Sequence, residues 1–258
     1  MKKLGAKRET THTVISDIKE IITASKHDEF THFVFRGQSS TKYQLVPSIA
    51  RKQSFLDNEN NIIAMAAYRK PDIFPIHSSP IELLAKLQHY GIPTRLLDVT
   101  RNALVALYFA CGDEATKSED GVIYIFKYDI RKSCNINILE GAYQNNKWCS
   151  GMVDKTLQKM DRPIIIEAPA DLLRQNVQQG MYMLFLNDFP PMEETPEYSN
   201  SISPVLDTDS SIIGKIIISS RGKKGIKREL ESLGISESTL FPENIDLFSA
   251  EMKKQFEV

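Results

Sequence analysis

The sequence feature that most constrains the fold is the stretch from residue 88 to residue 110, QHYGIPTRLLDVTRNALVALYFA. It concentrates polar and ionisable side chains between two apolar helical patterns: His89, Tyr90, Thr94, Arg95, Asp98, Thr100 and Arg101. Burying such groups is costly unless they are paired. Two interpretations are open at this point. The stretch is either a ligand site at the mouth of the fold or a structural turn in which an Arg95–Asp98 pair pins one helix to the next.

The residues before this stretch predict a helix that begins at Pro80. Ser79 can serve as its N-cap, and Glu82 stands where a capping box places its acidic residue. Gly91 is the expected C-terminal stop. This reading puts His89 in the last helical turn, beside the polar cluster.

The residues after the turn predict a second helix, from Arg101 to about Gly112, which is apolar nearly all round and therefore central. Asp98 or Thr100 can cap its N-terminus, and a cap is a common role for either residue type. A capping role and a role in chemistry can coexist at these positions.

A third segment, HFVFRGQ at residues 32–38, predicts a short buried strand that delivers Arg36 at its end. Gly37 allows the chain to leave the strand sharply. A guanidinium stays charged at physiological pH, so a partly buried Arg36 requires an anionic partner. That partner is either a carboxylate of the protein or a phosphate of a ligand.

The remaining segments mix strands and helices without βαβ alternation, which predicts an α+β fold with a mainly antiparallel, split sheet in a single domain. Residues 1–27 are expected to form an N-terminal helical extension and residues 28–258 the domain, with a flexible excursion near 187–210. Further strands are predicted at 121–129, 162–169, 181–186 and 211–220, a helix ending at Gly234, and a last amphipathic helix at the C-terminus.

Composition and motif content narrow the range of possible functions. Thirty-two basic and 33 acidic residues give a net charge of -1, which offers no argument for a nucleic-acid or membrane-surface partner. The 3 cysteines lack metal-binding spacing, so no metal is expected, and their usage fits a reducing cytoplasm. No apolar run reaches the roughly 18–20 residues of a membrane span. Rossmann, Walker and nucleophile-elbow motifs are absent from the sequence.

The segments FRGQ at 35–38, QHYGIPTRLLDVT at 88–100 and the LYFA that follows together resemble the FRG-domain family. The resemblance continues through GVIYIF, through Arg174 to Gly180 and into LGISESTLFPENID, and so covers about residues 28–255. The family occurs in bacteria and phage-related elements and carries no assigned activity, so the resemblance implies a domain and not a reaction.

The order of parts is also similar to that of ADP-ribosyltransferases. In that superfamily a first strand ends in Tyr/Phe-Arg-Gly, and its arginine grips a phosphate of NAD; here that arginine would be Arg36. A strand of the Ser-Thr-Ser type would correspond to residues 98–100. The place of the catalytic glutamate is taken by Gln178, Gln179 and Gly180. Either a glutamine orients the ribose, or His89 or Asp98 supplies the chemistry, or the scaffold has lost transfer activity.

The resemblance implies NAD as a substrate and a set of site residues. The residues expected to act in catalysis are His89, Asp98, Thr100 and Gln178. The residues expected to bind the substrate are Arg36, Gly37, Gln38, Tyr90, Thr94, Arg95 and Gln179.

Three functions follow from these expectations. The first is an NAD-using ADP-ribosyltransferase or NAD-degrading effector, such as a toxin or phage-defence component with a protein or nucleic-acid target. The second is a non-catalytic module that binds a nucleotide, nucleic acid or peptide. The third is a nuclease-like toxin that uses His89, Arg95 and Arg36.

Overall fold

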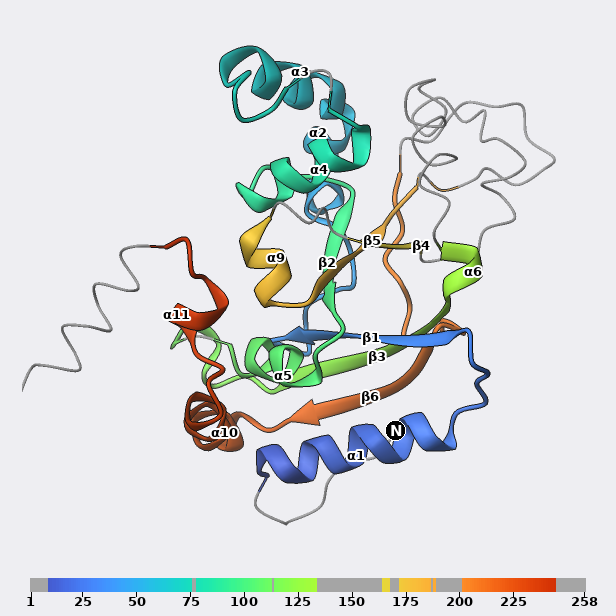
Figure 1. The fold of residues 1–258 in the computed structure, drawn as a ribbon, viewed down its shortest axis with the longest axis vertical. Coiled ribbons are helices and arrows are strands. Elements are labelled where there is room, and N and C mark those ends of the chain that lie inside the picture. The colour runs from blue at the N-terminus through green and yellow to red at the C-terminus, as the bar shows by residue number, and fades with distance from the viewer. Residues whose placement is uncertain are drawn as a thin grey trace, which may run out of the picture.

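A six-stranded sheet, all of whose pairings are antiparallel, forms the centre of the computed structural model, which describes residues 9–75, 78–112, 114–133, 164–167, 172–186, 188 and 201–244 (Figure 1). The strands are β1 (Thr31–Gln38), β2 (Leu96–Thr100), β3 (Gly121–Asp129), β4 (Ile164–Glu167), β5 (Gly180–Leu184) and β6 (Ile212–Ile218). Their order across the sheet is β4-β5-β2-β1-β3-β6. The predicted α+β class and antiparallel sheet are therefore confirmed.

Helices lie around this sheet. They are α1 (Thr11–Ala24), α2 (Gln53–Asp57), α3 (Glu59–Arg69), α4 (Pro80–His89), α5 (Ala103–Cys111), α6 (Ile130–Ser133), α9 (Leu173–Val177), α10 (Ser220–Ser232) and α11 (Glu237–Leu240), with short 3-10 turns at Ser48–Arg51 and Glu114–Thr116. The predicted helix at the extreme C-terminus lies outside the described residues, as do Cys134, Trp148 and Cys149. Of the predicted excursion near 187–210, residues 188 and 201–210 are described.

The sheet consists of two three-stranded halves joined at one point. Every residue of β1 is in register with β3, and every residue of β2 is in register with β5. Between β1 and β2, in contrast, the register contains the single pair Phe35–Thr100. The two strands diverge beyond this pair, and in Figure 1 they run in clearly different directions. The divergence opens the sheet beside Arg36 and Asp98.

Helix α5 lies directly on β1 and β3, and two glycines allow this close approach. A Cβ at Gly37 would lie 1.8 Å from the carbonyl oxygen of Ala106, and a Cβ at Gly121 would lie 2.0 Å from that of Ala110. No other residue type fits at such distances. The glycine of the Arg36-Gly37 pair is therefore required for packing, because it lets helix α5 lie close to β1.

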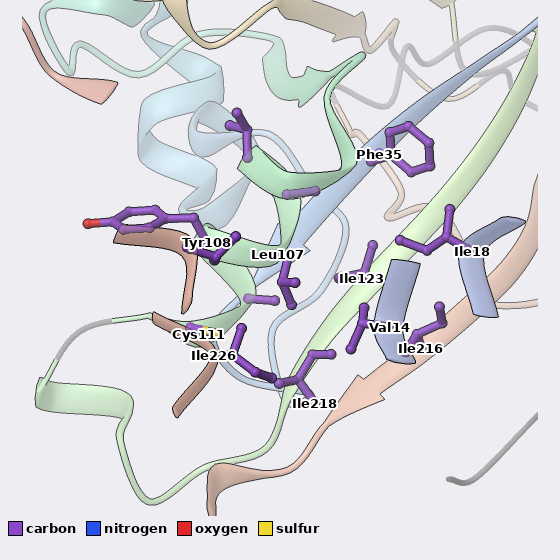
Figure 2. Close-up of a cluster of buried hydrophobic side chains, with 14 of the residues drawn as sticks. Val14, Ile18, Phe35, Leu107, Tyr108, Cys111, Ile123, Ile216, Ile218 and Ile226 are labelled. Atoms are coloured by element: carbon purple, nitrogen blue, oxygen red, sulfur yellow. The ribbon is translucent and has the colours of Figure 1, made fainter. Parts of the chain in front are cut away.

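A cluster of buried aliphatic side chains holds α1, α5 and α10 against the β1-β3-β6 half (Figure 2). Val14 of α1, Leu107 of α5 and Ile226 of α10 are fully buried in it. Because α1 contributes to this core, the helix predicted within the extension 1–27 packs as part of the same hydrophobic cluster as the sheet. Burying each such side chain stabilises the fold by about 1.5–3 kcal/mol.

A buried ion pair fixes α3 beside β2. The Nε of Arg95 donates to both carboxylate oxygens of Glu59, at 2.8 and 2.7 Å, and Nη2 lies 2.6 Å from Oε2. Arg95 is 0% exposed and Glu59 is 4% exposed. The partner of Arg95 is therefore Glu59, 36 residues earlier in the chain, in place of the Asp98 considered from the sequence.

The helix ends follow the predicted pattern at α4 but not at α5. The Ser79 hydroxyl accepts a hydrogen bond from the backbone N–H of Glu82 at 3.2 Å, as predicted. Helix α5 begins two residues later than expected, and its N-cap is Asn102, whose side chain accepts from the Leu104 N–H at 2.9 Å. The prediction that Asp98 or Thr100 caps this helix was wrong, because both residues still belong to β2.

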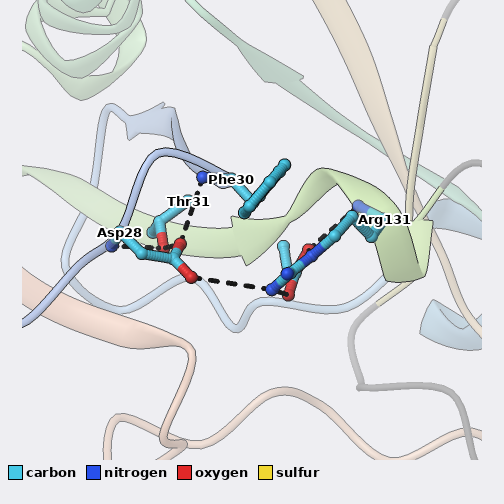
Figure 3. Close-up of polar contacts among 5 residues, drawn as sticks. Asp28, Phe30, Thr31 and Arg131 are labelled. Atoms are coloured by element: carbon cyan, nitrogen blue, oxygen red, sulfur yellow. Dashed lines mark hydrogen bonds and ion pairs between the residues drawn. The ribbon is translucent and has the colours of Figure 1, made fainter.

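The far ends of β1 and β3 are tied by an exposed polar cluster (Figure 3). Arg131 forms ion pairs with Asp129 at 2.6 Å and with Asp28 at 3.6 Å, and its guanidinium carbon lies 4.1 Å from the Phe30 ring centroid. The Thr31 hydroxyl, which donates to Asp28, lowers the pKa of that carboxyl. Exposed pairs of this kind contribute little to stability, about 0–1 kcal/mol each.

We expect the Cys111 thiol to be unreactive in the folded protein. Cys111 is buried in α5, and burial raises the pKa of its thiol to about 12, which suppresses the nucleophilic thiolate. A variant with Cys134→Ser and Cys149→Ser should not react with a thiol reagent at pH 8 until denaturant is added. Rapid labelling of the folded variant would contradict this burial.

Candidate functional site

Two cavities meet where the sheet divides. The larger has a volume of about 730 Å³ and the smaller about 200 Å³. Arg36, Gly37 and Phe109 line both of them. The end of β1 and the central helix α5 therefore form a shared wall, and Arg36 is the charged residue common to the two spaces.

Arg36 is held by a backbone carbonyl, and its Nε has no partner within the described part of the chain. Its Nη1 donates to the carbonyl oxygen of Asp98, a group left accessible because β1 and β2 diverge there. Its Nε is buried and has no hydrogen-bond partner among the described residues. Burial lowers the pKa of Arg36 to about 10; the charge of Asp98 acts in the opposite direction and that of Arg51 in the same direction. The side chain remains a cation at neutral pH.

The Asp98 carboxylate lines the smaller cavity and is held by two amides. Gln88 Nε2 donates to Oδ2 at 2.8 Å, and Gln175 Nε2 lies 3.4 Å from Oδ1. Thr94 in turn donates to Gln88 Oε1 at 2.8 Å. Thr94 was predicted to bind substrate, but it is 1% exposed and lines neither cavity, so its contact orients Gln88. Asp98 is thereby fixed at the cavity wall.

Thr100 and Gln178, two of the residues expected to act in catalysis, both line the smaller cavity. The Thr100 hydroxyl donates to the Gln178 backbone carbonyl at 2.6 Å, and Gln178 Nε2 donates to the Leu240 carbonyl at 2.9 Å. Both residues are buried. These donors are used within the protein, so neither side chain has the freedom of a catalytic donor in this conformation.

His89 and Tyr90 lie outside the lining of both cavities. His89 Nε2 is 3.0 Å from Glu243 Oε2, and the two aromatic rings of His89 and Tyr90 meet edge to face at 5.0 Å. Tyr90 is 58% exposed and also packs against Phe74. The structure thus associates His89 with the segment after α11 and not with Arg36.

The remaining predicted residues divide between the site and its surroundings. Gln38 lines the larger cavity, where its Oε1 is buried without a described partner. Gln179 has a positive φ of 47° and lines a different cavity of about 410 Å³ beside Arg101. Arg95, buried against Glu59, lines none of these spaces, so its charge is neutralised within the core.

Several site residues were not predicted. Gln88 and Gln175 hold Asp98, Arg51 and Arg174 add positive charge, and Phe109 is the shared aromatic wall. Phe109 was missed because it lies in an apolar helix, whose sequence pattern predicts only core positions. Gln175 stands 77 residues from its partner Asp98, and a single sequence holds no sign of that contact.

The family model of the FRG domain matches residues 31–119. The match begins at β1, includes Arg36 and Asp98, and ends after α5. It is shorter than the resemblance seen in the sequence. No curated protein and no solved structure matches the chain. Within the described residues, no helix is long and apolar enough to cross a membrane, and no group of three or more metal-ligating side chains is found.

Proposed function

We propose that the FRG domain of this chain binds NAD or a related nucleotide at the divided sheet and acts as an ADP-ribosyltransferase or NAD glycohydrolase. One observation carries this proposal. Arg36 lines both cavities, and its buried Nε has no hydrogen-bond partner in the part of the chain that the structure describes. An arginine in such a setting suits a phosphate, which accepts two of its N–H groups at once.

The composition of the larger cavity supports a nucleotide. Its charged lining residues are Arg36, Lys42 and Arg51, all cations. Lys42 is exposed and paired with Glu119 at 2.8 Å, so Arg36 and Arg51 are the more effective pair. Phe109 and Tyr43 provide aromatic surface on which a base can pack. About 730 Å³ lies within the range of small-molecule sites.

The smaller cavity supports a reaction at the nicotinamide–ribose bond. Cleavage of that bond develops positive charge on the ribose, and a fixed carboxylate nearby lowers the barrier. Asp98, held by Gln88 and Gln175, is the one acidic side chain that lines this cavity in the described structure. We assign it the electrostatic role that a glutamate would otherwise have. A role as toxin or phage-defence effector would follow from NAD consumption in the cell.

Two variants test this function. Arg36→Met should weaken NAD binding by about tenfold or more, because a charge-assisted contact is lost. Asp98→Asn should bind NAD nearly as well as the wild type but release nicotinamide at least about 100-fold more slowly. Calorimetry and a chromatographic assay of nicotinamide measure the two effects. Arg221→Met, on the exposed side of α10, serves as the control. Absence of both NAD binding and turnover in the wild type would rule the function out.

A second candidate is a binding module without catalysis. It is favoured by the internal hydrogen bonds that occupy Thr100 and Gln178, together with the missing glutamate. In that case the wild type would bind the nucleotide and return it unchanged, and Asp98→Asn would behave like the wild type. The nuclease alternative depends on His89, whose ring faces Glu243, and gains no support from the cavities.

Nucleotide binding should also depend on pH in a way that identifies Arg36. The guanidinium is charged below its pKa of about 10 and loses that charge above it. The wild-type advantage over Arg36→Met should therefore stay constant from pH 7 to about 9 and shrink as the pH passes about 10. Titration of nucleotide binding by both proteins measures this difference. An advantage that persists unchanged at pH 11 would contradict the lowered pKa of Arg36.

A further inference from the structure

A second arginine faces the smaller cavity from another element. Arg174 lies in α9, which contacts β5, whereas Arg36 lies in β1. The Nε of Arg174 is buried and, like that of Arg36, has no hydrogen-bond partner among the described residues. Two arginines, one from β1 and one from α9, thus line one space of about 200 Å³, and the Nε of each has no partner among the residues that the structure describes. Buried donors are ordinarily satisfied, so their coincidence here calls for an acceptor.

The charges around this space point to an anion as that acceptor. Among the residues lining the smaller cavity, Arg36 and Arg174 are cations and Asp98 is the acidic residue. Both Asp98 oxygens already face amide donors, from Gln88 and Gln175. The cavity lining therefore carries a net positive charge, and a phosphate would satisfy the two Nε donors that lack a partner among the described residues.

Aromatic contacts fix the Arg174 guanidinium in place. Its central carbon lies 4.8 Å from the ring centroid of Phe241, and that ring meets Phe109 edge to face at 6.2 Å. Phe109 is the wall shared by the two cavities. A stacked guanidinium is preorganised and loses little entropy when it binds an anion.

On the basis of the proposed function, we propose that Arg174 is the second anion-binding side chain of the site. The ligand then carries two phosphates: one lies between Arg36 and Arg174 in the smaller cavity, and the other lies between Arg36 and Arg51 in the larger cavity. The adenosine occupies the larger cavity, and in NAD the nicotinamide ribose lies beside Asp98 in the smaller cavity, next to the phosphate held by Arg36 and Arg174. The ligand class is a nucleoside diphosphate or a dinucleotide with a pyrophosphate, and a nucleoside monophosphate binds more weakly.

The test compares ADP with AMP by calorimetry. The wild type should bind ADP about tenfold or more tightly than AMP, because the second phosphate reaches Arg174. In Arg174→Met this preference should vanish, with ADP bound about as weakly as AMP. Arg174→Lys retains the positive charge and should keep part of the preference. Arg221→Met should behave as the wild type.

Further variants separate phosphate binding from a structural effect. Phe241→Leu removes the stacking partner and leaves the charge, so it should weaken ADP binding less than Arg174→Met does. If Arg174 only supported the fold, Arg174→Met would weaken ADP and AMP equally, and that result overturns the inference. An unchanged ADP preference in Arg174→Met also overturns it, while NAD binding lost in Arg36→Met would leave the proposed function standing. If the wild type binds neither ADP, AMP nor NAD, both fall together.

Discussion

Replacing Glu59 with Leu is expected to lower the free energy of unfolding by about 3–5 kcal/mol. The reason is the position of Arg95, whose guanidinium lies fully buried and donates to both Glu59 oxygens. Without the carboxylate, a cation remains in the core and loses the charge that compensates most of its desolvation. Chemical denaturation followed by circular dichroism measures the change.

Two further proteins make this result specific. The double variant Glu59→Leu/Arg95→Met removes both charges and should regain most of the lost stability, because apolar groups can replace a buried pair at little cost. Glu114→Leu removes a carboxylate from an exposed pair with Lys117 and should leave the denaturation midpoint unchanged. If Glu59→Leu unfolded at the same denaturant concentration as the wild type, the Glu59–Arg95 pair would contribute nothing to stability.

Replacing Gly37 with Ala is expected to destabilise the protein by about 3 kcal/mol or more, at the upper end of overpacking effects. The added methyl group would lie 1.8 Å from the Ala106 carbonyl oxygen and 2.8 Å from the Ala110 backbone nitrogen. Helix α5 would have to move away from β1, and Phe109 with it. Nucleotide binding at Arg36 should therefore fall together with the denaturation midpoint.

Gly225 provides a matched glycine for comparison. It lies within α10, and a Cβ there meets no atom within 4 Å beyond the neighbouring backbone of its own helix. Gly225→Ala should raise the free energy of unfolding by about 0.5–1 kcal/mol, because alanine loses less backbone freedom in a helix. Equal stability changes in Gly37→Ala and Gly225→Ala would refute the close contact between α5 and β1.

Local patterns in the sequence predicted much of the fold. The strand at residues 32–38, the helix capped by Ser79 and the central position of α5 depend on residues close in the chain, and all three are confirmed. The prediction that the strand ends at Arg36 was wrong, because β1 continues through Gly37 to Gln38. The N-cap of α5 was misplaced because β2 continues through Thr100, which a propensity argument cannot distinguish from a cap.

Contacts between distant residues set the limit of prediction. The sequence shows that Arg95 needs an anion but not that Glu59 supplies it, because the choice depends on how α3 packs. The hydrogen bond between Thr100 and Gln178 likewise joins residues 78 positions apart in the chain. His89, only one residue from Gln88, faces Glu243, because neighbouring positions in a helix point in different directions.

The single registered pair between β1 and β2 has a mechanical consequence. The two halves of the sheet share one backbone pairing, Phe35 with Thr100. They can therefore rotate about it more easily than halves joined by a full ladder of hydrogen bonds. Beside this pairing, the Arg36 guanidinium of β1 donates a hydrogen bond to the Asp98 carbonyl of β2. A ligand bound to both Arg36 and Arg174 would hold the two halves of the sheet together. Hydrogen exchange of the β1 and β2 amides should therefore slow when the ligand binds.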